Sequence, residues 1–346
     1  MADFVKLREQ IELWRKQYNV AGISVAVTDR KKTLFAEGFG TESVERPVLA
    51  VTRDTRFKIA SISKMITAIT CMRLADRGLL DLDAPIKTYV PWLRLSRREA
   101  EETMTLRHLL CHGSGLSGEL RKDGVRDERY LEASLREMLP ELKMFSLPGE
   151  GAFLYSNYGF VLASCIAQQV TGEIYSQLAR HLVTEPLGMH CTHYHFNEIA
   201  TYPWALPHRE KEDDTLYVEH RVSSVESRFG SGEVFSTPTD LCILARFLMN
   251  GGITDSGERL LSEKSVREML TPQILRDDGD HHGLGIHIRN FEGICLYGHT
   301  GWLPPYRASV FFDDDRGVGI AVALNTDKPD IRDDIMRVIL NEGDQL

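Results

Sequence analysis

Segments with the alternation of β-strands gather at the two ends of this chain, whereas segments with helical periodicity fill its middle. After a helical segment at residues 3–18, residues 22–27 and 33–36 form a predicted strand pair joined by a polar turn. Further strands and a last helix are predicted at the carboxyl end, at residues 284–289, 294–297, 308–312, 318–324 and 330–340. The chain therefore has to return to where it began if these strands are to share one sheet.

The middle of the chain carries the helices and their end signals. Apolar residues recur at helical spacing in residues 61–77, 105–111, 157–171, 174–186 and 238–250. Gly78 and Gly172 are placed to end two of these helices, and Thr237 is placed to cap another at its start. Helices and strands are thus separated along the chain rather than alternating.

This separation predicts an α+β fold class: an antiparallel sheet formed by both chain ends and flanked by helices, with a large inserted helical lobe. We expect one domain over residues 1–346. Its sheet lobe is expected at residues 1–60 and 275–346, and its helical lobe at residues 61–274.

Charge and hydropathy exclude two classes of partner. Lys and Arg number 41 against 50 Asp and Glu, so the net charge is −9, and no basic patch suited to nucleic acid occurs. No apolar run approaches the ~18 residues that span a bilayer. The amino terminus carries scattered charges and shows no secretory signal, so we expect a cytoplasmic protein. The sequence leaves the oligomeric state open.

The six cysteines are expected to be reduced thiols. They are widely spaced and form no C-x-x-C pair, and three of them fall inside apolar helical segments, as buried thiols do. The positions are Cys71, Cys111, Cys165, Cys191, Cys242 and Cys295.

The segment Phe57–Lys64 is the most informative about chemistry. Ser61 is placed at the start of a helix, where backbone N–H groups are free. Lys64 lies three residues later on the same helix face, with Cβ atoms about 5–6 Å apart. A serine hydroxyl becomes a nucleophile when a base takes its proton, and a desolvated lysine can lose its charge and act as that base. This spacing is common by chance, so the pair alone is a weak signal.

Two further segments follow in order. Tyr155-Ser156-Asn157 stands just before an apolar helix, and Gly298-His299-Thr300-Gly301 lies between two predicted strands. With these three motifs the chain resembles the serine β-lactamase/penicillin-binding protein family. It is most similar to the class C β-lactamase-like branch, which also contains esterases, D-amino-acid peptidases and acyltransferases. The resemblance covers residues 10–325 and includes the stretches 105–116, 185–189 and 232–241.

The resemblance implies a β-lactamase/transpeptidase-like fold and a set of catalytic roles. Ser61 would be the acylated nucleophile, Lys64 would help to deprotonate it, and Tyr155 would be the partner general base or acid. The backbone N–H groups of Ser61 and Trp302 would form the oxyanion hole. A charged Lys64 is expected to lower the pKa of Tyr155, and the two would titrate as a coupled pair. The sequence leaves open which of them takes the proton.

The same resemblance implies four substrate-binding residues: Asn157, His299, Thr300 and Gly301. His299 stands where β-lactamases and penicillin-binding proteins place a lysine, and a neutral imidazole is a weaker anchor for a β-lactam carboxylate. The bulky Trp302 and the stiff loop after it favour an apolar acyl or leaving group.

The predicted function is therefore a serine hydrolase that cleaves an ester or amide bond of a small molecule or peptide, most like an esterase, without metal or cofactor. Three alternatives remain open: a β-lactamase or D-amino-acid peptidase, an acyltransferase to an acceptor other than water, and a non-catalytic binding member of the family.

Other patterns favour less specific interpretations. Residues 113–118 match G-x-G-x-x-G by letter but follow a predicted helix, and a Ser114–His112 pair lacks the rest of a triad. Asp313–Asp315 is expected to be a solvated turn. Two groups contain metal-binding residue types, but neither has the spacing of a structural zinc site, and solvated polar loop or strand residues explain both: His190, Cys191, His193 and His195, and Asp278, Asp280, His281, His282 and His287.

Overall fold

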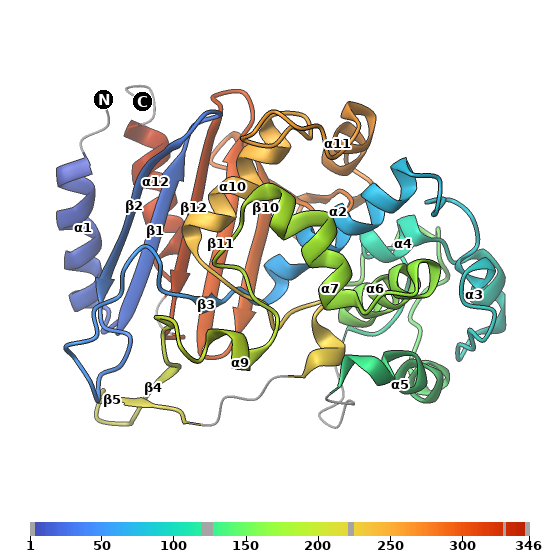
Figure 1. Cartoon of the computed structure of the whole chain (residues 1–346), viewed down its shortest axis with the longest axis horizontal. Helices are drawn as coiled ribbons and strands as arrows, with labels where there is room; N and C mark the ends of the chain where they lie inside the picture. Colours follow the sequence, from blue (N-terminus) through green and yellow to red (C-terminus); the bar gives the residue numbers. More distant parts are fainter. Residues whose placement is uncertain (1–3, 119–126, 221–224, 328–329, 343–346) are drawn as a thin grey trace.

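An eight-stranded antiparallel sheet is the centre of the computed structural model, which describes residues 4–118, 127–220, 225–327 and 330–342. The strand order is β2-β1-β12-β11-β10-β9-β8-β7. The strands are β1 Gly22–Thr28, β2 Thr33–Gly40, β7 Ile274–Leu275, β8 His281–His282, β9 His287–Phe291, β10 Ile294–Leu303, β11 Tyr306–Asp313 and β12 Val318–Leu324. Because β1 pairs with β12, the two chain ends meet inside the sheet, which confirms the predicted fold class (Figure 1).

Both faces of the sheet are covered, which is why β1 and β12 are buried along their whole length. Side chains alternate between the faces of a strand. Ile23 and Val25 of β1 accordingly join the core under the terminal helices, whereas Ala26 joins the core on the other face. The terminal helices α1 and α12 lie on one face and α10 packs on the other (Figure 1). They span Phe4–Gln17, Arg332–Glu342 and Pro238–Met249.

The middle of the chain forms a helical region beside the sheet. Its α-helices are α2 Ser63–Asp76, α3 Arg98–Thr103, α4 Leu106–Leu110, α5 Leu131–Met138, α6 Asn157–Thr171, α7 Tyr175–Ala179, α8 Glu185–Leu187, α9 Phe196–Ile199 and α11 Glu263–Leu270. Short 3₁₀ turns are η1 Ala60–Ile62, η2 Ile86–Thr88, η3 Glu128–Tyr130, η4 Leu139–Glu141 and η6 Glu226–Arg228. Helix α2 is buried from Ser63 to Leu74, so it runs through the core.

The predicted helix ends are confirmed where their chemistry was specific. Gly172 closes α6 with φ 71°, and the Thr237 hydroxyl accepts a hydrogen bond from the Asp240 amide at the start of α10. The predicted helix 174–186 is interrupted by a π-helical turn, η5 Arg180–Thr184, between α7 and α8. The local sequence predicted the two ends of this helical segment but not the π-helical turn inside it.

Two predicted strands at the carboxyl end were misplaced. The strand expected at 284–289 begins later, at His287, because Gly285 adopts φ 71° and packs against α2. The strand expected to end at 297 continues to Leu303, so His299-Thr300-Gly301 lies inside β10 and not between strands. The glycines misled the prediction: a Cβ at Gly298 or Gly301 would collide with the backbone of Val310 or Ile59. They serve close packing rather than a turn.

Two short strand pairs complete the fold. Strand β3 (Phe57–Lys58) pairs with β6 (Phe235–Ser236), and β4 (His208–Glu210) pairs with β5 (Leu216–Val218). The first pair matters for the site because β3 leads directly into η1, which carries Ser61.

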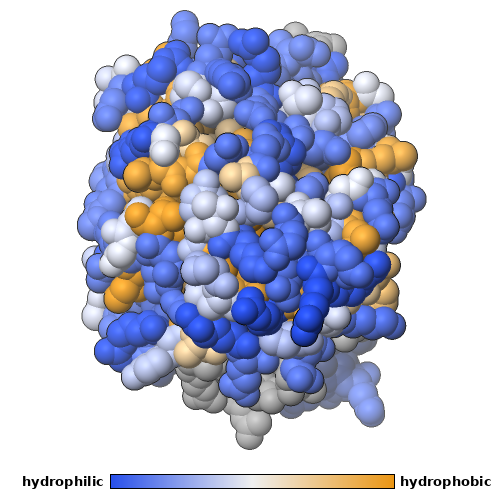
Figure 2. Space-filling model, turned by 90° about the vertical axis from the view of Figure 1, so that its right-hand side faces the viewer, coloured by the Kyte–Doolittle hydropathy of each residue, from blue (hydrophilic) through white to orange (hydrophobic). Residues whose placement is uncertain are grey.

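The six cysteines are unpaired, and four of them are buried: Cys71, Cys111, Cys165 and Cys242. Within the described residues, no helix is both long and apolar enough to cross a bilayer. Figure 2 shows that the end of the helical region is mainly hydrophilic, with small separate hydrophobic patches.

Candidate active site

A cavity of about 370 Å³ lies where η1, the start of α6 and β10 come together. Six of the residues predicted from sequence line it: Ser61, Tyr155, Asn157, His299, Thr300 and Trp302. Lys64 lies beneath them with no exposed surface, and Gly301 is buried in β10. The tertiary structure therefore gathers three motifs that are far apart in the chain.

Ser61 is held at the cavity by strained backbone on one side and a close strand on the other. The preceding residue, Ala60, has φ 48°, an uncommon conformation for a residue with a side chain. The Ile59 amide donates to the Val234 carbonyl at 2.9 Å, which anchors the approach to η1. Gly301 lets β10 pass directly beside Ile59 and Ala60, since a Cβ there would collide with the Ile59 carbonyl. This close approach brings Trp302 to the cavity that Ser61 lines.

Among the described residues, Lys64 Nζ has three hydrogen-bond partners, and each is a neutral oxygen. Its Nζ lies 3.1 Å from Ser61 Oγ, 2.8 Å from Asn157 Oδ1 and 2.6 Å from the Ser231 carbonyl. Burial lowers the pKa of Lys64 well below its ordinary value. A neutral amine has two N–H groups for the amide and carbonyl oxygens, which leaves its lone pair for the Ser61 hydroxyl. The site can thus hold a lysine in the form of a base.

Tyr155 is the second side chain beside Ser61. Its hydroxyl hydrogen-bonds the Ser61 side chain, and Lys64 Nζ lies 4.9 Å from the centre of its ring. Burial raises the pKa of Tyr155 above its usual value, although the Ser61 hydrogen bond opposes the change. The expectation that Lys64 would lower this pKa is wrong, because removal of water from the phenol outweighs the other effects.

Asn157 begins α6 and is engaged at both ends of its amide. Its Oδ1 accepts from Lys64 and its Nδ2 donates to the Gly118 carbonyl at 3.0 Å. The helix start that places it is capped by Ser156, whose hydroxyl accepts from the Gly159 amide at 3.1 Å. In this arrangement Asn157 orients Lys64, and it also lines the cavity, where the resemblance implied a substrate-binding residue.

His299 is buried and neutral. Its Nδ1 lies 2.6 Å from the Thr300 carbonyl, and burial lowers its pKa well below the ordinary value.

At the rim of the cavity the Trp302 side chain is 61% exposed. Its indole donates to Asp327 at 2.7 Å, and the Arg307 guanidinium lies 5.5 Å from the ring centre. The Trp302 ring therefore lines the cavity at its rim, and Asp327 and Arg307 support it.

Of the two groups of metal-binding residue types found in the sequence, the structure brings together part of one and none of the other. Among the described residues, two groups bring metal-binding atoms within 4.8 Å of one another: Asp278 with Asp280 and His287, and His112 with His282 and His299. Neither includes the residues at 190–195, where His195 hydrogen-bonds carboxylates instead. In the first group Asp278 pairs with Arg276 and Asp280 with His287, so its carboxylates already have partners. The exposed His281 belongs to neither group.

The remaining sequence patterns have structural explanations. Residues 113–118 form a loop after α4, in which Gly115 (φ 73°) packs closely against Ser146, so no strand–turn–helix unit is present there. His112 Nδ1 accepts the Ser156 amide at 3.0 Å. Asp313 pairs with Arg316 at the β11–β12 turn.

Several residues at the site were missed by sequence reasoning. Arg228, Glu233 and Arg276 line the cavity beside the predicted residues, and the Ser231 carbonyl contacts Lys64. The stretch 232–241 carried the one available signal, since it resembles the family. Its second residue, Glu233, has φ 73° and forms a buried ion pair with Lys58.

Comparisons with known proteins agree with this geometry. The sequence profile described as Beta-lactamase matches residues 4–342. Penicillin-binding protein 4 of Amycolatopsis lactamdurans is 26% identical over 308 residues, which cover 86% of this chain and 79% of that protein. Protein flp of Staphylococcus aureus (strain NCTC 8325 / PS 47) is 27% identical over 315 residues, and these cover 89% of this chain but 60% of flp.

Solved structures show the same fold. The octameric penicillin-binding protein homologue from Pyrococcus abyssi superposes with a TM-score of 0.84 at 25% identity, covering 99% of this chain and 78% of that one. The D-amino acid amidase from Ochrobactrum anthropi SV3 has a TM-score of 0.78 at 22% identity, with 98% of each chain covered. Since the profile spans nearly the whole sequence and the fold agrees with it, this chain belongs to the Beta-lactamase family.

Proposed function

We propose that this chain is a serine hydrolase that cleaves an ester or amide bond through an acyl-enzyme on Ser61. One observation carries the proposal: the Nζ of a fully buried Lys64 lies 3.1 Å from Ser61 Oγ, and its other two hydrogen-bond partners among the described residues are neutral acceptors. An amine in this environment favours the uncharged form and can take the serine proton. The family, whose members include serine hydrolases, supports the same chemistry.

Acylation then proceeds in two steps. Lys64 accepts the Ser61 proton as Oγ bonds to the substrate carbonyl carbon, and the amides of Ser61 and Trp302 stabilise the resulting oxyanion. Two such donors are worth several kcal/mol, since losing one costs about 3–4 kcal/mol in a measured protease. The bond to the leaving group breaks as the proton returns from Lys64 to that group by way of the Tyr155 hydroxyl. The raised pKa of Tyr155 suits this role, because the phenol stays protonated and able to donate.

Deacylation repeats the sequence with water as the nucleophile. Water loses its proton to the same base and attacks the ester carbonyl, and Ser61 Oγ leaves with the proton restored. An acceptor other than water would make the chain an acyltransferase through the same intermediate.

The first candidate for the substrate is an ester with an apolar acyl or leaving group. His299 stands neutral at the position of the family's lysine, so it offers no positive charge to a carboxylate. The Trp302 side chain supplies an apolar wall at the entrance.

The second candidate is a substrate with a carboxylate, such as a β-lactam or a peptide. The observation that favours it is that two arginines, Arg228 and Arg276, line the same cavity. Arg276 is already held by Asp278, with Nη2 to Oδ2 at 2.7 Å, which reduces the charge it can offer. We therefore rank the ester first.

Intact-mass spectrometry tests the acyl-enzyme directly. The protein is incubated with p-nitrophenyl esters, D-amino-acid peptides and nitrocefin, and we expect one acyl group per chain, absent in Ser61→Ala. Adducts that persist equally in Ser61→Ala would reject the nucleophile, and the absence of both an adduct and turnover with every substrate would favour a non-catalytic binding protein. Turnover then ranks the substrates: an ester rate less than about tenfold above the nitrocefin rate would contradict the esterase assignment. In that case Arg276→Gln should lower kcat/KM for nitrocefin and not for the esters.

A further inference from the structure

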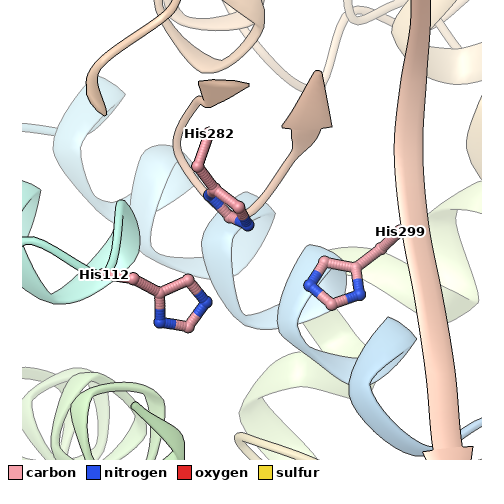
Figure 3. Close-up of side chains that lie close together, drawn as sticks. All are labelled: His112, His282 and His299. Atoms are coloured by element: carbon pink, nitrogen blue, oxygen red, sulfur yellow. The ribbon is translucent and has the colours of Figure 1, made fainter. Parts of the chain in front are cut away.

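Three histidines that the proposed mechanism does not use as a group lie close together (Figure 3). His112 follows α4, His282 is in β8 and His299 is in β10. One nitrogen of each ring points toward a common centre, and these atoms lie within 4.8 Å of one another. All three side chains are buried, and no hydrogen-bond partner for their Nε2 atoms is found among the described residues.

The backbone around each ring determines which nitrogen carries the proton. The Ser156 amide donates to His112 Nδ1 at 3.0 Å, so this nitrogen has the lone pair and the hydrogen of neutral His112 is on Nε2. His282 and His299 have the opposite arrangement. Their Nδ1 atoms face the carbonyls of Gly283 and Thr300 at 3.0 and 2.6 Å, and a carbonyl can only accept, so their Nε2 atoms carry lone pairs.

One donor and two acceptors therefore face the common centre. A metal bound by three histidines needs a lone pair on each, with the other ring nitrogen donating to an oxygen. His282 and His299 meet that requirement, whereas His112 does not. A single water molecule matches the set, because it can accept from His112 and donate to the other two.

His112 also holds both sides of Tyr155. Its carbonyl accepts the Leu154 amide at 2.9 Å, and its Nδ1 accepts the Ser156 amide at 3.0 Å. Between these two hydrogen bonds, the imidazole lies against the phenol ring with a centroid distance of 4.3 Å. His112 does this with φ 63°, a left-handed conformation that most side chains avoid. One residue thus fixes the main chain before and after Tyr155 and one face of its ring.

We propose that His112 is a positioning residue for Tyr155, kept as the Nε2–H tautomer by the Ser156 amide and linked to His282 and His299 through one buried water. The three imidazoles are then a neutral hydrogen-bonded support for the tyrosine and not a metal centre. This role rests on the proposed function, because it requires that Tyr155 take part in acyl transfer.

Kinetics of two His112 variants test the positioning role. His112→Ala removes the amide acceptor and the ring, and should lower kcat for the best ester by about 10²-fold, with KM changed less than about threefold. His112→Asn should lose less, since asparagine tolerates positive φ and its Oδ1 can accept the Ser156 amide. The matched control, His281→Ala, removes an exposed histidine next to the cluster and should leave kcat unchanged.

A double variant separates positioning from loss of folding. His112→Ala added to Tyr155→Phe should cost almost nothing further in kcat, because the group being positioned is already gone. A full additional 10²-fold loss would overturn the proposal, and so would wild-type kcat in His112→Ala. If the wild-type protein neither forms a Ser61 adduct nor turns over any substrate, the proposed function has failed, and that result is obtained before any variant is compared.

The tautomers of the three histidines can be measured in the wild-type protein without an activity assay. Histidine ¹⁵N spectra should place the proton on Nε2 in His112 and on Nδ1 in His282 and His299, with assignments from the single His→Ala variants. Titration with Zn²⁺ alone should leave these three signals in place. Stoichiometric Zn²⁺ binding that is lost in His282→Ala, or a proton on Nδ1 of His112, would overturn the proposal in favour of a metal site.

Discussion

Two buried lysines near the site, Lys58 and Lys64, have opposite kinds of partner: one is paired with a carboxylate and the other with neutral oxygens. Lys58 forms an ion pair with Glu233, and the two side chains are 4% and 6% exposed. Lys64 is also buried, but its three contacts are with neutral oxygens and it has no carboxylate partner among the described residues. Lys58 ends β3 and Lys64 is the second residue of α2, so only the short turn η1 separates their two elements.

The comparison teaches that the partner, and not burial alone, decides what a buried lysine does. A carboxylate compensates the buried ammonium, so Lys58 and Glu233 can tie β3 to the segment before β6. Without one, the loss of hydration is unopposed, and burial lowers the pKa of Lys64. Lys58 is therefore suited to stabilising the fold, whereas Lys64 is suited to accepting a proton.

Replacing Lys64 should give the largest effect of any change that tests this contrast. Lys64→Met removes the base, and kcat/KM for the best ester should fall by about 10³- to 10⁴-fold, because general-base catalysis contributes up to this amount. Steady-state kinetics give the loss, and circular dichroism checks that the variant is folded. A loss below about tenfold in a folded Lys64→Met would show that another group takes the serine proton.

Replacing Lys58 should instead affect stability. Lys58→Met leaves the Glu233 carboxylate buried without its partner, and the free energy of unfolding should fall by about 3–5 kcal/mol. Urea denaturation measures it. The double variant Lys58→Met/Glu233→Gln is the control, and it should recover about half of the loss or more because no unpaired charge is left. A Lys58→Met protein as stable as the wild type would mean that this pair does not act as a buried ion pair.

The smallest expected effect is a change in how the free energy of unfolding depends on pH, and it tests the lowered pKa of Lys64 directly. In the unfolded chain Lys64 stays protonated up to about pH 10.4, whereas the folded protein releases its proton at lower pH. Between the folded pKa and that value the unfolded state binds more protons, so Lys64 makes stability rise with pH, by up to about 1.4 kcal/mol per pH unit. Below the folded pKa this slope disappears.

Lys64→Met should lack that slope, and the difference between wild type and variant isolates it from the other titrating groups. Urea unfolding at several pH values from 6 to 9 measures the difference. Parallel stability curves for the two proteins throughout this interval would contradict a lowered pKa for Lys64 that lies within it.

The order of the motifs was enough to predict which residues meet. Ser61, Tyr155 and His299 line one cavity, as the resemblance implied, although His299 lies inside β10 and not at an element boundary. Helix α6 occupies the predicted residues 157–171, since its polar start and its closing glycine are local signals. The extent of β10 could not be predicted in the same way, because a glycine used for close packing looks like a glycine used for a turn.

The sequence by itself determined the antiparallel sheet made by both chain ends and the serine, lysine and tyrosine that meet beside it. The sheet follows from the periodicity of its segments, and the three side chains follow from the resemblance of their motifs to those of a known family. Only the tertiary structure decided that Lys64 has neutral partners and no carboxylate among the residues it describes, that Tyr155 is buried enough to keep its proton, and that His112, His282 and His299 face one another. Protonation depends on hydration and on contacts between distant segments, and neither is written in the local order of residues.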